Sequence, residues 1–230
     1  MPTETYFEQI KKQLDSSLKP ICVESIRILP DSIVLGTAIL AGISLCKSYG
    51  VLLLTMFELM LAQRCLSMVV AGIAPVGAEE NATCPVCLPG FVFPNLMRIS
   101  LVETVGKPSL FPSPSMFFLS GTIAYMLGAM QQFSREIKSL QGEIQTRTLI
   151  AAVFSLLFML ALLSLRYSYG CESFGSLLLS LILGSIMGMM IVFQNKVLFG
   201  RDGINILNVP MILTATDRGR PMYVCAPSDI

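Results

Sequence analysis

Two long stretches that carry no charged residue constrain this chain more than any other feature. They are residues 149–165 and 174–193, and each approaches the roughly 20 residues that a helix needs to cross a bilayer. Of the 230 residues, 53% are hydrophobic and 13% are charged, whereas about a quarter of a soluble domain is charged. The sequence therefore predicts an integral membrane protein and excludes a disordered chain.

The predicted fold class is all-α, a polytopic membrane helix bundle with about five transmembrane helices. The predicted spans are residues 33–46, 51–76, 116–130, 149–165 and 174–193. Three regions are predicted. Residues 1–30 form an amphipathic N-terminal segment, and residues 195–230 form a cytosolic tail. The transmembrane bundle covers residues 31–194 and includes an exterior loop at residues 77–114.

The two terminal regions carry weaker patterns. Apolar residues at helical spacing indicate that residues 1–30 lie along the membrane interface or pack on the protein as a solvated helix. In the tail, two apolar runs flank a Gly-containing turn at residues 216–220, which predicts a small β-hairpin.

Basic residues near the ends of the spans predict the orientation. Five spans place the chain termini on opposite sides of the membrane, and the tail side is richer in Lys and Arg. Its basic residues near a span are Lys47, Arg135, Lys138, Arg147, Lys196 and Arg201, against Arg27, Lys107 and Arg166 on the other side. The positive-inside rule therefore predicts a cytosolic C-terminus. Asn81, which stands in a glycosylation sequon, then lies on the exterior side, where glycans and disulfides form.

The chain contains no histidine. This excludes His-based catalytic triads, His general bases and His metal ligands, so we predict no catalytic residue, no cofactor and no metal. The net charge is +1 and no basic cluster is present, which argues against a nucleic-acid partner. The predicted partners are membrane lipids and other membrane proteins, with a homo-oligomer as a further option.

Three cysteines are candidates for a disulfide on the exterior side: Cys84, Cys87 and Cys171. A redox-active Cys-x-x-Cys pair usually opens a helix, whose dipole lowers the thiol pKa, but Pro85 and Pro89 make a helix start at Cys84 unfavourable. A zinc site would need two more ligands, and the chain has neither a second Cys-x-x-Cys pair nor a histidine. A structural disulfide or inert thiols are therefore favoured over redox chemistry or metal binding.

Glu58 and Arg64 are intramembrane polar candidates, because they lie inside the second predicted span. A charge at bilayer depth costs at least about 2.5 kcal/mol and is normally paired or exposed to water. Six residues apart on one helix, the two side chains point about 120° away from each other. Each therefore needs a partner on another helix, or the stretch re-enters the membrane with a break near Gln63. A polar contact between helices is favoured over a transport pathway.

Small residues recur every four positions in two of the predicted spans. They are Ser176, Ser180, Gly184 and Gly188 in the last span, and Ser120, Ala124 and Gly128 in the third. Small residues at this spacing let two helix backbones approach closely. Packing within the bundle is the preferred interpretation, and a homodimer face is the alternative.

The third to fifth spans resemble integral-membrane lipid phosphatases of the type 2 phosphatidic acid phosphatase superfamily. Phe-Pro-Ser-Pro-Ser at residues 111–115 opens the third span in the place of that family's Pro-Ser-Gly-His motif, and Arg166 ends the fourth span like the Arg of its Ser-Arg motif. Pro112, Ser113 and Arg166 match the family pattern, but Ser115 and Glu172 stand where the family has its two histidines.

Covalent phosphoryl transfer in that family needs a His nucleophile and a His acid, and this chain has neither. The resemblance therefore implies a degenerate relative that keeps the helix bundle without catalysis. It also implies a hypothetical binding site for an anion or a lipid headgroup, formed by Arg166, Ser113, Ser115 and Glu172. Such a site requires these residues to converge at one end of the bundle.

Residues 31–36, 198–210 and 222–226 look like parts of uncharacterised multi-pass membrane proteins of nucleocytoplasmic large DNA viruses. This similarity implies a location in the endoplasmic reticulum or the internal membrane of a virion, and contacts with membrane or capsid proteins. We therefore expect a non-catalytic integral membrane protein with a structural or scaffolding role. The alternatives are a lipid-headgroup-binding or atypical lipid-phosphatase-like protein, and a small transporter or channel that uses Glu58 and Arg64.

Overall fold

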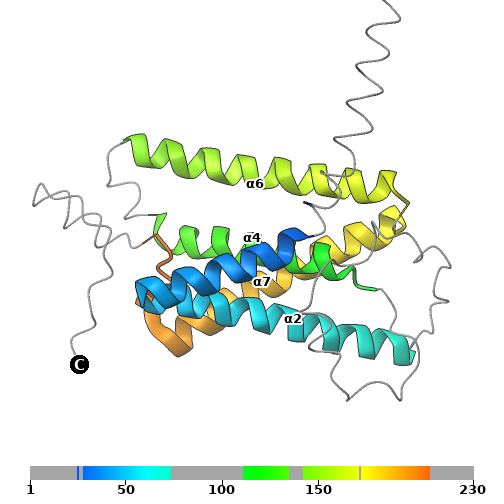
Figure 1. The fold of residues 1–230 in the computed structure, drawn as a ribbon, viewed down its shortest axis with the longest axis horizontal. Coiled ribbons are helices and arrows are strands. Elements are labelled where there is room, and N and C mark those ends of the chain that lie inside the picture. The colour runs from blue at the N-terminus through cyan, green and yellow to red at the C-terminus, as the bar shows by residue number, and fades with distance from the viewer. Residues whose placement is uncertain (1–24, 26–27, 74–110, 135–141, 171, 208–230) are drawn as a thin grey trace, which may run out of the picture.

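A computed structural model describes residue 25 and residues 28–73, 111–134, 142–170 and 172–207. These residues form five helices, and none of them belongs to a β-strand. The helices are Ile28–Ser44, α2 (Lys47–Ile73), α4 (Pro114–Gln132), α6 (Gly142–Ser168) and α7 (Phe174–Gly203). The part of the chain that the structure describes therefore has the predicted all-α fold, drawn in Figure 1.

Several predictions lie outside the described residues. The amphipathic N-terminal segment falls almost entirely on residues 1–24, 26 and 27, and the exterior loop falls on residues 74–110. The hairpin falls mostly on residues 208–230, and the described residues just before it, 204–207, form turns. These elements stay predictions.

Each predicted span corresponds to one helix, but only three of the described helices are long and apolar enough to cross a membrane. The three segments are Lys47–Val70, Leu149–Ser168 and Phe174–Gly203. The Ile28–Ser44 helix is shorter, and the 19 residues of α4 include Ser, Thr, Tyr and two Gln, which lower its hydropathy. Where the sequence predicts about five spans, the described residues thus form five helices, of which three are of spanning length and hydropathy.

Two helices continue past points where the sequence suggested a break. α2 is a single helix of 27 residues, so there is no interruption at Gln63. α7 has 30 residues and continues through Asn195 to Gly203, with a kink at Gly200, where φ is 76°. The helix thus extends beyond residue 195, where the predicted tail begins, and Asn195 is fully buried inside the bundle.

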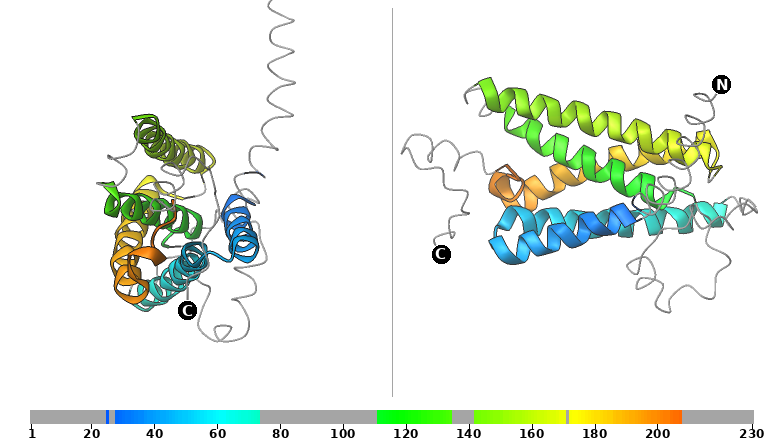
Figure 2. Two further views of the ribbon diagram at one scale, coloured as in Figure 1. Left: turned by 90° about the vertical axis from the view of Figure 1, so that its left-hand side faces the viewer. Right: turned by 45° about the horizontal axis from the view of Figure 1, so that its top comes forward.

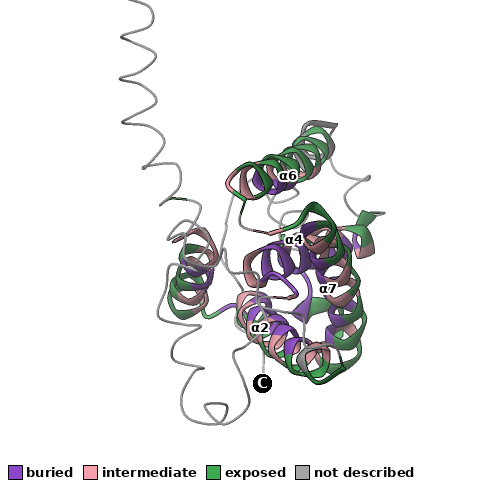
Figure 3. Ribbon diagram, turned by 90° about the vertical axis from the view of Figure 1, so that its right-hand side faces the viewer, coloured by how far each residue is buried: buried purple, intermediate pink, exposed green. Residues whose placement is uncertain are grey.

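α4 is the central helix of the bundle. It packs against α7, α2 and α6, and α2 and α6 lie on opposite sides of it (Figures 1 and 2). Ten of its 19 residues are buried. In Figure 3 the α4 ribbon is mostly in the buried class, whereas α6 is mostly exposed.

The tightest contact in the bundle is between α4 and α7, and it depends on glycine. A Cβ atom built on Gly184 would collide with the Ser120 side chain and the Phe117 carbonyl oxygen, and one built on Gly188 would collide with the Gly121 carbonyl. The backbones of the two helices therefore touch where the small residues lie. This confirms the interpretation that the small residues pack within the bundle.

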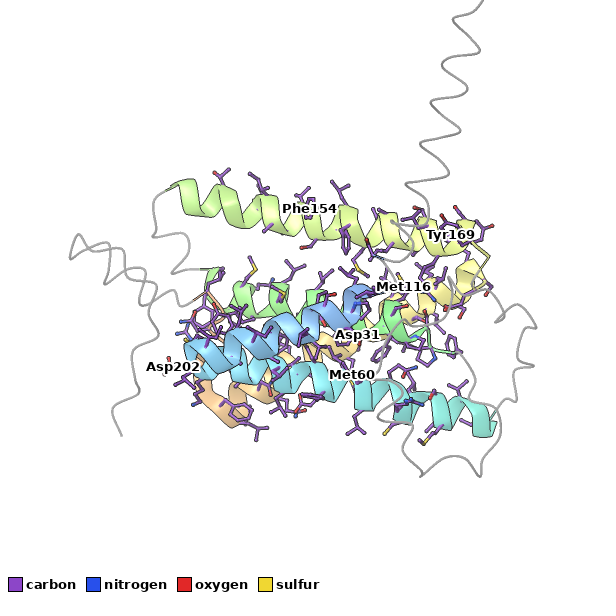
Figure 4. All side chains as sticks on the ribbon, in the orientation of Figure 1. Asp31, Met60, Met116, Phe154, Tyr169 and Asp202 are labelled. Atoms are coloured by element: carbon purple, nitrogen blue, oxygen red, sulfur yellow. The ribbon has the colours of Figure 1, made fainter. Side chains whose placement is uncertain are left out.

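Local sequence explains where α4 and α7 begin. Pro114 occupies the first turn of α4, where a missing N–H costs nothing. The Ser173 hydroxyl caps α7 by accepting a hydrogen bond from the Ser176 N–H at 3.3 Å. Both starts lie at the end of the bundle where α6 finishes, which we call the Arg166 end; the opposite end, where α2 begins, is called the Lys47 end. Tyr169 and Asp202, labelled in Figure 4, mark these two ends.

Candidate functional site

A buried ion pair closes the Arg166 end. Arg166 Nη2 donates to Glu172 Oε1 at 2.9 Å, and the side chains are only 12% and 9% exposed. Arg166 Nε and Glu172 Oε2 are also buried but have no hydrogen-bond partner. The pair joins the last turn of α6 to the segment that enters α7, so the structure brings together two of the four residues expected at the anion site.

Two aromatic side chains flank this pair at the surface. The rings of Tyr167 and Phe174 pack edge to face with their centroids 5.8 Å apart. The two residues are 56% and 50% exposed. Exposed aromatic residues at the end of apolar helices are typical of the level of lipid headgroups.

Ser113 and Ser115 share the Arg166 end but are not bonded to the ion pair. The Ser113 N–H donates to Ser180 Oγ at 2.8 Å, and Ser180 lies roughly 9 Å along α7 from Phe174. The Ser113 hydroxyl is fully buried and has no partner. Ser115 is half-buried in the first turn of α4. The four residues therefore share one end of the bundle without forming one hydrogen-bonded site.

A second polar cluster lies at the junction of α2, α4 and α7. Asn195 Nδ2 donates to Thr55 Oγ1 at 2.8 Å and to the Tyr125 hydroxyl oxygen at 3.4 Å. All three side chains are fully buried. The Thr55 hydroxyl donates in turn to the Val51 carbonyl at 2.9 Å, but Asn195 Oδ1 has no partner. We call Thr55, Tyr125 and Asn195, together with Glu58 and Gln194, the polar junction.

Glu58 finds its partner on α7 rather than on its own helix. Gln194 Nε2 donates to Glu58 Oε1 at 3.2 Å, and Glu58 Oε2 is buried without a partner. This agrees with the expectation of a polar contact between helices. Arg64, half-buried further along α2, is not part of this contact, so the structure does not bring the two intramembrane candidates together.

The Lys47 end is held by cations that cap helix C-termini. Lys47 Nζ donates to the Phe199 carbonyl of α7 at 3.0 Å, and Arg201 Nη2 donates to the Gln132 carbonyl of α4 at 3.3 Å. Arg201 also lies 5.3 Å from the centroid of the Phe133 ring. Lys196 Nζ donates to Gln132 Oε1 at 2.8 Å. Positive charge at helix C-termini is stabilising, so these residues have structural roles besides their bearing on orientation.

One cysteine favours the membrane orientation opposite to the one that the Lys and Arg residues favour. Asn81, Cys84, Cys87 and Cys171 lie outside the described residues. Cys46, at the Lys47 end, is disulfide-bonded, whereas Cys65 is an exposed free thiol. Because disulfides persist in oxidising compartments, Cys46 favours an exterior Lys47 end, while the distribution of Lys and Arg favours a cytosolic one.

The sequence contains signals for the polar junction, but they come from uncharged residues. Asn195 follows Gly188 by seven residues and so continues the buried stripe of α7, and Tyr125 follows Gly121 by one turn of α4. Within the described ranges, no group of three His, Cys, Asp or Glu side chains is placed to hold a metal ion. The sequence matches no protein-family model, and neither a curated protein nor a solved structure matches the chain.

Proposed function

We propose that this chain is a multi-pass integral membrane protein with a non-catalytic, structural role, and that its C-terminus is cytosolic. The observation that carries the proposal is the apolar surface of the helices of spanning length. On α6, the exposed large apolar residues are Leu149, Ile150, Val153, Phe154, Leu156, Leu157 and Leu160. Phe154, midway along the helix in Figure 4, is 68% exposed. Lipid tails are the environment in which such a surface is stable.

The closed ion pair supports a structural role over an enzymatic one. Arg166 is the residue that would hold a phosphate, and its Nη2 already donates to Glu172. Neither residue supplies the nucleophilic imidazole of a His-dependent phosphoryl transfer. An ion pair buried between two helices ties them together, and removing one partner leaves an uncompensated charge.

Two measurements test this proposal. The protein should stay in the membrane fraction after alkaline carbonate extraction and dissolve only in detergent. The purified protein, incubated with phosphatidic acid or a diphosphate lipid, should release no more phosphate than the Arg166→Ala variant does. Release from membranes by carbonate would contradict an integral protein, and turnover that Arg166→Ala abolishes would contradict a non-catalytic role.

Binding of a lipid headgroup is the second candidate function, and the unpartnered Arg166 Nε favours it. Glu172 competes with any phosphate for the guanidinium group, so binding requires the carboxylate to move away. Glu172→Gln removes the competing charge and keeps the side chain's shape. If the site serves a headgroup, this variant should retain phosphatidic acid more tightly than the wild type in native mass spectrometry. Equal retention by both proteins would argue for the structural role alone.

A further inference from the structure

The polar junction contains two buried oxygen atoms that lack a hydrogen-bond donor. They are Glu58 Oε2 on α2 and Asn195 Oδ1 on α7. Asn195 is fully buried, and both hydrogen bonds that it makes use its amide nitrogen. Buried acceptors without donors are rare in folded proteins, and each one requires an explanation in terms of strain, water or a bound ion.

Both atoms belong to the same small region of the bundle. Thr55 and Glu58 lie three residues apart, which places them on one face of α2, and Gln194 and Asn195 are adjacent on α7. Two hydrogen bonds join α7 to α2 in this region, one from Gln194 to Glu58 and one from Asn195 to Thr55. Tyr125 of α4 completes the region from the third side, bonded to Asn195.

The chemistry of the region selects the kind of ligand. All the acceptor groups of the polar junction are hard oxygens: one carboxylate, two amide carbonyls and two hydroxyls. Such oxygens prefer hard cations. Water could donate to Glu58 and Asn195, but it would leave the carboxylate charge uncompensated. Glu58 makes its hydrogen bond to a neutral amide, and a single carboxylate balances a single positive charge.

The depth of the region makes that compensation necessary. Glu58 is eleven residues from the start of α2, and Asn195 is eight residues from the end of α7, so the site lies roughly 12–17 Å from the Lys47 end. The hydrocarbon core is about 30 Å thick. The carboxylate therefore stands near mid-depth, where an uncompensated charge is most costly.

We propose that the polar junction binds a hard monovalent cation between Glu58 and Asn195, with the hydroxyls of Thr55 and Tyr125 as further oxygen ligands. The alkali metal ions Na⁺ and K⁺ are cations of this kind. Half-buried Glu58 and exposed Gln194 lie where α2 and α7 meet at the surface of the described bundle. This site goes beyond the proposed structural role and does not depend on Arg64.

Thermal unfolding of the purified full-length chain in a nonionic detergent tests the site. The midpoint is measured against NaCl and KCl, with choline chloride added to keep the ionic strength constant, and separately against pH from 5 to 8. Choline controls for screening because it is too large for the junction. Cation binding to the folded state should raise the midpoint with concentration.

Variants locate the response. Glu58→Gln should weaken the apparent cation affinity roughly tenfold or more, because it removes the charged ligand. Asn195→Asp adds a second carboxylate of the same shape and should strengthen the response. Asp202→Asn, which neutralises an exposed acid at the Lys47 end, should respond as the wild type does.

The outcomes separate binding of an alkali metal ion from protonation of Glu58. A midpoint that rises with NaCl or KCl in the wild type, less in Glu58→Gln and more in Asn195→Asp, supports an alkali metal ion. A midpoint that ignores both salts but depends on pH in the wild type and not in Glu58→Gln means that Glu58 takes up a proton itself, and this outcome overturns the cation site. A wild type that responds neither to the salts nor to pH overturns the site, even if the variants fail to fold.

Discussion

The contact between α4 and α7 makes a quantitative prediction about glycine. A Cβ atom on Gly188 would lie 2.9 Å from the carbonyl carbon of Gly121 and 3.0 Å from its Cα. Carbon atoms rest at roughly 3.5–4.0 Å, so Gly188→Ala must push the helices apart by roughly 0.5–1 Å. The obstacle is backbone, which cannot rotate away as a side chain can.

The expected cost follows from two opposing effects. Overpacking a well-packed core costs about 1–3 kcal/mol, and replacing Gly by Ala inside a helix returns up to about 1 kcal/mol. Gly188→Ala should therefore lower the free energy of unfolding by about 1–2 kcal/mol, which corresponds to about 2–8 °C for a chain of this size. The decrease in midpoint should appear in thermal unfolding of the purified protein in detergent.

Gly175→Ala is the matched control. Gly175 lies on the same helix, but a Cβ atom there would meet nothing within 4 Å. This variant should melt at the wild-type temperature or slightly above it. If Gly188→Ala melted at or above Gly175→Ala, the close contact of the α4 and α7 backbones, and the bundle built on it, would be refuted.

Three further predictions concern charge and orientation. Arg166→Met alone should cost about 3–5 kcal/mol of unfolding free energy, and Glu172→Leu in the same chain should restore most of it; additive losses in a double-mutant cycle would contradict the buried pair. Asp31 stands at the start of the Ile28–Ser44 helix, outside the helices of spanning length, and burial raises the pKa of its carboxyl above the usual range. Because the folded state then holds this proton to a higher pH than the unfolded chain, stability should fall as pH rises above about 4, and Asp31→Asn should be more stable than the wild type at pH 7 but not at pH 3. With a cytosolic C-terminus, Asn81 should carry a glycan in a eukaryotic host, seen as a glycosidase-sensitive gel shift that Asn81→Gln abolishes; a chain without that shift would favour the orientation that the Cys46 disulfide suggests.

The positions of the helices could be predicted from the sequence because the hydrophobic pattern is local. Every predicted span contains the middle of an observed helix. The ends of the helices are predicted less accurately than their positions, because a helix end depends on contacts with other helices, which the hydrophobic pattern does not describe. α7 extends past its apolar run because the side chains of Asn195 and Lys196, polar as they are, bond to α2 and α4.

The candidate sites also differ in how far the sequence predicts them. Arg166 and Glu172 flank the short connection between two helices, so their proximity follows from sequence separation alone. Thr55, Tyr125 and Asn195 come from three helices far apart in the chain, and their meeting depends on how each helix is rotated about its axis. Glu58 could be identified because a charge in an apolar run is conspicuous, whereas its partner Gln194 could be found only from the packing.

The polarity of α4 has a physical explanation in its central position. Its 19 residues extend about 28 Å, which is close to the thickness of the hydrocarbon core. Ser120 and Thr122 donate to carbonyls one turn earlier on α4 itself, at 3.1 and 2.8 Å, and both are buried between helices rather than exposed to lipid. A hydropathy scale treats these hydroxyls as if they faced lipid, so it underestimates a helix whose neighbours are protein. Because the α4 backbone contacts α7 at Gly184 and Gly188, near the middle of that helix, an α7 that crosses the bilayer requires α4 to lie at the same depth.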